Sequence, residues 1–174
     1  EEVSDDFTTL DTEAWKVFGD AGWISDGWLE MTGISKGQQG AIYNPQTQVA
    51  EGNVSISFSM ATGGGDGDGG ADGFAVTIVQ TDSVSELEDD IIAEALSTCG
   101  IGYGVGGVYG DWEGNALTVE IDTYKNEDNG TTQLHTDPTG EDHIAITLDG
   151  DASNHLWWAA VGDIEDLVWR TVQV

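Results

Sequence analysis

The run from Leu117 to Asn126 constrains the fold of this chain more than any other segment. Apolar and polar side chains alternate along it, in the order Leu117, Thr118, Val119, Glu120, Ile121, Asp122, Thr123, Tyr124. Successive side chains of a strand point to opposite faces, so a strand here would place both carboxylates on one face and the aliphatic side chains in a core. Asp137-Pro138 and His143-Ile144-Ala145-Ile146 follow. We therefore expect hard oxygen ligands and one imidazole to gather here.

Strand-like runs recur along the whole chain, and they are short, alternating and punctuated by Gly, Asp and Asn. Their spacing predicts an all-β sandwich. We expect strands at Trp28–Met31, Val54–Met60, Phe74–Val79, Leu117–Tyr124, His143–Leu148, His155–Ala160 and Val168–Val174. One short helix is expected over residues 83–98, because Ser83 can cap its first turn and Glu86 stands three residues later. For the adjacent Trp157 and Trp158, which a strand would point to opposite faces, core packing is favoured over a sugar platform.

The order of these motifs resembles the metal-and-sugar segment of the legume-type (L-type) lectins. In that family the pattern runs Glu-x-Asp-Thr-aromatic-x-Asn, then Asp-Pro, then His-Ile-x-Ile. Other segments are similar to the opening strands of bacterial and archaeal members and to the family's Ala-Asp-Gly-x-Ala-Phe segment: Asp5–Phe7, Trp23–Leu29, Asn53–Phe58 and Gly70–Val76. The resemblance implies a concanavalin-like jelly-roll β-sandwich of two antiparallel sheets. Residues 1–174 would form one such domain, without the C-terminal strands of other members.

Such lectins bind a calcium ion and a neighbouring transition-metal ion through shared ligands. Carried over by position, the resemblance assigns the bridging role to Asp122 and Asp137, the rest of the calcium site to the Tyr124 carbonyl and Asn126, and the second ion to Glu120 and His143. The donor types agree, since calcium takes carboxylate, amide and carbonyl oxygen, whereas an imidazole beside carboxylates suits Mn²⁺. An insert at residues 127–136 offers Asp128 or Asn129 as an alternative calcium ligand.

The resemblance also implies a sugar site. The sugar would lie between Asp72, Asn126 and a backbone N–H near Gly100, with the Tyr124 ring as a stacking platform. A carboxylate accepts hydrogen bonds from sugar hydroxyls and an amide donates them, so this pair can recognise two neighbouring hydroxyl groups. We therefore expect a non-catalytic, metal-dependent domain that binds glycans.

The charge of the chain bounds its environment and partners. Thirty-three acidic residues stand against four basic ones, for a formal net charge of -29. At molar salt the Debye length falls to about 3 Å, which screens most repulsion between surface carboxylates. This composition indicates a halophilic, archaeal protein and excludes nucleic acid as a partner. No apolar run reaches the roughly 20 residues of a membrane span, so direct membrane insertion is not expected. N-glycosylation patterns at Asn53 and Asn129 fit a glycoprotein located outside the cell or at its surface.

Two other functions compete with lectin activity. Laminarinase-like glycoside hydrolases of the same fold carry Glu-x-Asp-x-x-Glu on one strand, but Tyr124 and Lys125 stand where their acid belongs. A structural subunit of an extracellular filament or surface layer would use the scaffold for assembly alone. An open sheet edge favours that alternative, because a second polypeptide or another copy in a homo-oligomer could complete the sandwich. His155 has no partner pattern, and an exposed or core histidine is expected there.

Overall fold

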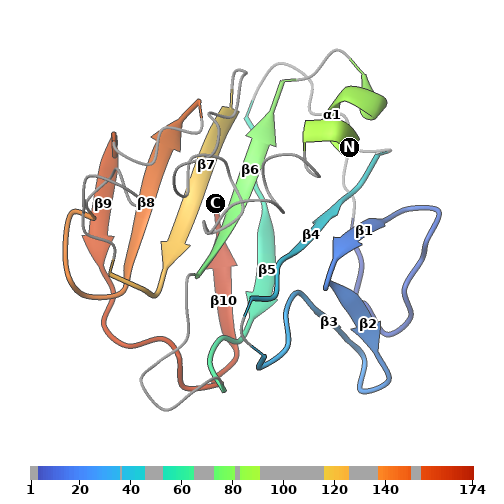
Figure 1. Cartoon of the computed structure of the whole chain (residues 1–174), viewed down its shortest axis with the longest axis horizontal. Coiled ribbons are helices and arrows are strands. Elements are labelled where there is room, and N and C mark those ends of the chain that lie inside the picture. The colour runs from blue at the N-terminus through green and yellow to red at the C-terminus, as the bar shows by residue number, and fades with distance from the viewer. Residues whose placement is uncertain are drawn as a thin grey trace. The chain divides into compact units, whose positions relative to one another are not determined.

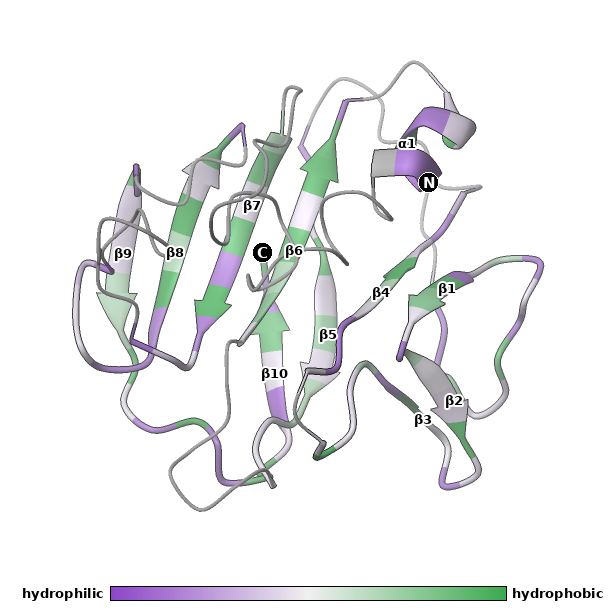
Figure 2. Cartoon of the chain, in the orientation of Figure 1, coloured by the Kyte–Doolittle hydropathy of each residue, from purple (hydrophilic) through white to green (hydrophobic). Residues whose placement is uncertain are grey.

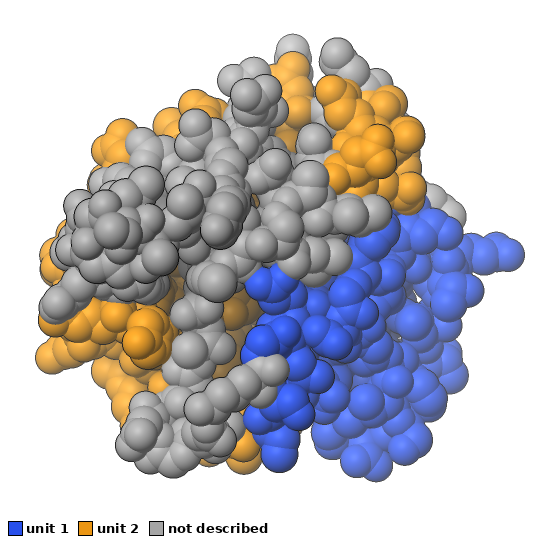
Figure 3. Space-filling view, viewed as in Figure 1, with its two compact units in different colours: residues 1–55 blue, residues 56–174 orange. Residues whose placement is uncertain are grey.

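The computed structural model describes residues 4–35, 37–45, 53–64, 73–80, 83–90, 116–125, 137–149 and 154–174. The chain divides into two compact units, Glu1–Ser55 and Ile56–Val174 (Figure 3). Strands dominate the described residues, every strand pairing among them is antiparallel, and one short helix accompanies them. The predicted all-β class is therefore confirmed. The jelly-roll connectivity and the assignment of all 174 residues to one domain stay predictions.

The first unit contains two pairs of short strands (Figure 1). β1 (Lys16–Gly19) pairs with β4 (Gly40–Tyr43), and β2 (Gly22–Ile24) pairs with β3 (Trp28–Glu30). Two indole N–H groups donate hydrogen bonds to the N-terminal loop. Trp15, just before β1, donates to the Asp5 carboxylate, and Trp23 of β2 donates to the Phe7 carbonyl, each at 2.8 Å. Strands this short show no clear alternation, and β1 and β4 were not predicted from the sequence.

The second unit is built on a four-stranded antiparallel sheet with the order β6-β7-β8-β9. Its strands are β6 (Gly73–Val79), β7 (Ala116–Asp122), β8 (His143–Leu148) and β9 (Trp157–Ala160). A second sheet of this unit pairs β5 (Ser57–Met60) with β10 (Arg170–Gln173). Phe58 of β5 meets Phe74 of β6 edge to face at a centroid distance of 5.6 Å, so an aromatic contact joins the two sheets.

The helix α1 (Val84–Asp90) begins where the sequence predicted it. The Ser83 hydroxyl accepts a hydrogen bond from the Glu86 N–H at 3.1 Å, which is the N-cap geometry expected from the capping pattern. The rest of the predicted helix, residues 91–98, lies outside the described residues. Among the residues that the structure describes, no helix is long and apolar enough to cross a bilayer.

The two faces of the four-stranded sheet differ in polarity, and the polar face is the more deeply buried one. Thr118, Glu120 and Asp122 of β7 share that face and are almost inaccessible. Figure 2 shows a hydrophilic band within the otherwise largely hydrophobic β7. On the opposite face Ile121 is buried, but Leu117 is 40% exposed. The prediction that all the aliphatic side chains of β7 lie in a core is therefore wrong for Leu117.

The edge strand β9 differs from its prediction in two ways. It begins at Trp157 rather than at His155, because the chain bends at Leu156. Trp157 and Trp158 point to opposite faces, as expected, but they are 53% and 43% exposed. Core packing of these two rings is therefore not observed. Leu148 is 42% exposed. Together with Leu117 and Trp157, it forms a part of the apolar face of this sheet that is open to solvent.

Candidate metal centre

The sheet register brings the predicted acidic residues and His143 together. In the β7–β8 pairing Asp122 lies opposite His143, and Glu120 lies opposite Ala145. Directly opposed residues of an antiparallel pair project from the same face, so these side chains share one side of the sheet. Small residues flank them on the neighbouring strands, because Gly73 and Ala75 of β6 pair with Asp122 and Glu120. The sequence thereby leaves space above the sheet that the longer polar side chains occupy.

Four of the predicted ligands form one buried cluster, which we call the acidic cluster: Glu120, Asp122, Asp137 and His143. Each offers a ligand atom, and these atoms lie within 4.8 Å of one another. Exposed fractions are 2%, 3%, 8% and 1% in the same order. Lys, Glu, Arg and Asp are almost never so deeply buried unless they are paired or bind a metal. The structure therefore brings these four predicted residues together.

Ionisation of this cluster without a cation is costly. Burial, reinforced by the neighbouring Asp137 and Glu120 carboxylates, raises the pKa of Asp122 from 3.8 to about 8, although the Tyr124 N–H donates to its Oδ1 at 2.7 Å. Burial acts to lower the pKa of the His143 imidazole, but the surrounding carboxylates, Glu120 first among them, outweigh it and raise that pKa. Each carboxylate is thus in an environment that a divalent cation would relieve.

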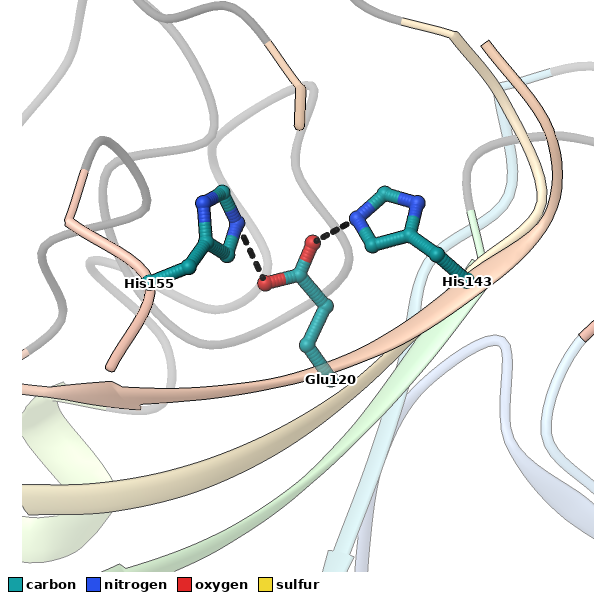
Figure 4. Close-up of side chains that lie close together, drawn as sticks. All are labelled: Glu120, His143 and His155. Carbon is teal, nitrogen blue, oxygen red and sulfur yellow. Dashed lines mark ion pairs between the residues drawn. The ribbon is translucent and has the colours of Figure 1, made fainter. Parts of the chain in front are cut away.

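A second group of ligand atoms was not predicted from the sequence. Glu120, His143 and His155 form what we call the histidine cluster, whose ligand atoms also lie within 4.8 Å of one another (Figure 4). The bend at Leu156 explains why the pattern missed His155: in an unbroken strand it would share a face with Trp157, away from the carboxylates. Strand alternation carries no information about such a bend, so the sequence pattern did not indicate that His155 lies near Glu120.

Three acidic residues form a further group: Asp142 in the turn before β8, and Asp163 and Glu165 in the segment after β9. Backbone contacts account for part of this group. The Asp142 carboxylate accepts a hydrogen bond from the Ile164 N–H at 2.9 Å, and the Asp163 carboxylate accepts one from the Glu165 N–H at 3.0 Å. Asp163 is exposed. These carboxylates therefore shape the loop, and we assign them no ligand.

The predicted sugar site is covered only in part by the described residues. Tyr124 follows the end of β7, is 49% exposed and donates its backbone N–H to Asp122 of the acidic cluster. Asp72, Gly100 and Asn126 lie outside the described residues, as do the alternative calcium ligands Asp128 and Asn129. Their assigned roles therefore stay predictions.

No family model matches the chain, and no curated protein matches its sequence. The functional argument therefore depends on the chemistry of the two clusters and on the motif order of the sequence.

Proposed function

We propose that this chain is a metal-dependent carbohydrate-binding domain without catalytic activity, located at the surface of a halophilic cell. The observation that supports the proposal most strongly is the acidic cluster, in which three buried carboxylates from β7 and the turn before β8 meet one imidazole from β8. A bound cation offsets the mutual repulsion of such carboxylates, so the donor set fits a metal ion.

The donor types support two different ions. Asp122 and Asp137 offer carboxylate oxygen, and with the Tyr124 carbonyl and Asn126 they would form the calcium side. Glu120 and His143 add an imidazole, which suits a first-row ion such as Mn²⁺. When bound, these ions would supply charge neutralisation and a fixed anchor for the residues that follow β7. The chain's own contribution is to hold Asp122 in place through the Tyr124 N–H.

A fixed segment after β7 is what sugar binding requires. Tyr124 is half exposed, and its backbone N–H contacts Asp122 of the acidic cluster, so its ring is available to stack on the apolar face of a sugar. Asn126 and Asp72 would donate to and accept from neighbouring sugar hydroxyls, with a backbone N–H near Gly100 as a further donor. Removal of the ions would release this segment and abolish sugar binding.

A structural role in an extracellular filament or surface layer is the second candidate. The observation that favours it is the partly open apolar face that carries Leu117, Leu148 and Trp157, because a second polypeptide or a further copy of the chain would bury such a face. Glycoside hydrolysis is disfavoured, since Tyr124 and Lys125 replace the third carboxylate that the hydrolase motif requires.

A glycan-array screen at molar salt, with calcium and manganese present, tests the proposal. The screen is repeated in excess EDTA and with the Asn126→Ala variant. Binding that disappears in both controls supports metal-dependent sugar recognition. Full binding in EDTA would overturn the metal-dependent mechanism. A failure to bind any glycan, while metal ions still raise the melting temperature, would favour the structural role instead.

A further inference from the structure

We propose that His155 is a direct ligand of a transition-metal ion, which it holds together with Glu120 and His143. This inference deepens the proposed metal centre and depends on it, because Glu120 and His143 belong to both clusters. It changes the expected second ion: two imidazoles and one carboxylate favour zinc or cobalt over manganese, whereas manganese favours oxygen-rich sites.

The approach of the two rings to Glu120 is the first argument. His143 Nε2 lies 3.5 Å from Glu120 Oε1, and His155 Nε2 lies 3.5 Å from Glu120 Oε2. Figure 4 shows the two imidazoles on either side of the carboxylate, each with a nitrogen turned toward it. The ring centroids are 5.9 Å apart and the planes are inclined by 76°, so the rings converge on Glu120 rather than stack on each other.

The distances favour a shared ion over direct hydrogen bonds. Charge-assisted N–H···O bonds measure about 2.7–2.9 Å, well below the observed 3.5 Å. Two ligand atoms that each bind one tetrahedral ion at about 2.1 Å stand about 3.4 Å apart. Each 3.5 Å separation therefore matches the spacing of two ligand atoms around one ion, and a single ion held by both histidines would engage both oxygens of Glu120.

Burial without hydrogen bonding is the second, independent argument. The side chains of His143, Glu120 and His155 are only 2%, 3% and 7% exposed. Neither histidine Nε2 atom has a hydrogen-bond partner, although both are inaccessible to solvent. Buried polar atoms are nearly always satisfied, and an ion bound by both nitrogens would satisfy them together.

The experiment uses the purified chain at molar salt after removal of metal with EDTA. Co²⁺ is titrated in the presence of excess Ca²⁺, visible absorption is recorded, and Zn²⁺ is then added as a competitor. We expect the strong absorption of low-coordinate Co²⁺, its loss on Zn²⁺ addition, and no displacement by Ca²⁺. The His155→Gln variant should lower Co²⁺ affinity at least about tenfold and weaken the absorption.

Two further variants make the result specific. Val168→Gln changes a residue that belongs to neither cluster and is 53% exposed, and it should leave Co²⁺ binding unchanged. His155→Asp restores a donor and should regain affinity while shifting preference toward Mn²⁺. Circular dichroism establishes that each variant is folded. If His155→Gln does not fold, the wild-type titration decides, because a failure of Co²⁺ to bind in the presence of calcium would exclude a transition-metal site.

The failure of this inference differs from the failure of the proposed function. Calorimetric calcium binding that persists while Co²⁺ and Zn²⁺ do not bind would overturn only the role of His155. Unchanged Co²⁺ affinity and absorption in His155→Gln would overturn it as well. A wild-type chain that binds neither calcium nor a transition metal would overturn the proposed metal-dependent function itself.

Discussion

Replacing Asp122 by asparagine tests whether the acidic cluster destabilises the metal-free protein and is stabilised by a bound cation. In the metal-free protein, burial raises the pKa of Asp122 to about 8, from 3.8. The folded state therefore binds this proton more tightly than the unfolded chain does. Protonation of Asp122 therefore contributes to the free energy of unfolding. This contribution is fully present below about pH 4 and is lost as the pH rises toward about 8. At about 1.4 kcal/mol per pKa unit, the loss is on the order of 6 kcal/mol.

The Asp122→Asn variant keeps the shape of the side chain and an oxygen that can accept the Tyr124 N–H. It never carries the buried charge, so the metal-free variant should be more stable than the wild type above about pH 8 and similar to it near pH 4. Calcium should reduce this difference in stability between the variant and the wild type. An ion at 100 times its Kd stabilises the wild type by about 2.7 kcal/mol, whereas the variant has lost a ligand and gains far less.

The assay is urea denaturation followed by near-ultraviolet circular dichroism at molar salt, in EDTA or in calcium, between about pH 4 and 9. Asp89→Asn, a change at an exposed position of α1, controls for the loss of one negative charge. Metal-free wild-type stability that stays flat from pH 4 to 8 would refute the argument. A variant that is less stable than the wild type in EDTA at every pH would refute it too.

Three further predictions follow from the fold. A Cβ at Gly63, where φ is +111°, would collide with the Glu165 carbonyl, whereas a Cβ at Gly162 would meet open space and cost only about 1–2 kcal/mol for its positive φ. Gly63→Ala should therefore destabilise the protein by about 1–3 kcal/mol more than Gly162→Ala does. Equal urea midpoints of the two variants would contradict this. Ser83→Ala should cost about 1 kcal/mol by removing the cap of α1, and the matched Ser85→Ala change should cost less; identical melting temperatures of the two variants would argue against the cap. Because the net charge is -29, the melting temperature should rise from low salt to molar KCl, and a fall would disprove screening as the dominant effect of salt.

The part of the site that sequence predicted best is the part governed by strand alternation. Period-two alternation placed Glu120 and Asp122 on one face, and the resemblance to the L-type lectins implied that Asp137 and His143 lie beside them. Alternation is a local property of one strand, and a strand seven residues long shows it clearly.

Features that depend on bends or on neighbouring elements were not predictable in this way. His155 reaches Glu120 only because the chain turns at Leu156, and periodicity cannot report such a turn. The exposure of Leu117 and of both Trp157 and Trp158 depends on what covers each face of the sheet, and a strand pattern does not specify its cover. Strands of three or four residues, such as β1, are too short to establish a period.

The pairing of Asp122 with His143 has a consequence for how the sheet assembles. A slip of one residue between β7 and β8 would turn each side chain of the slipped strand to the opposite face. The donors would then be divided between the two sides, and no ion could bind them together. An ion that requires Glu120, Asp122 and His143 on one side therefore recognises one alignment among several that backbone hydrogen bonding would accept. An ion bound at the proposed site would therefore favour the correct strand register, and chains refolded with calcium should contain fewer misaligned species than chains refolded in EDTA.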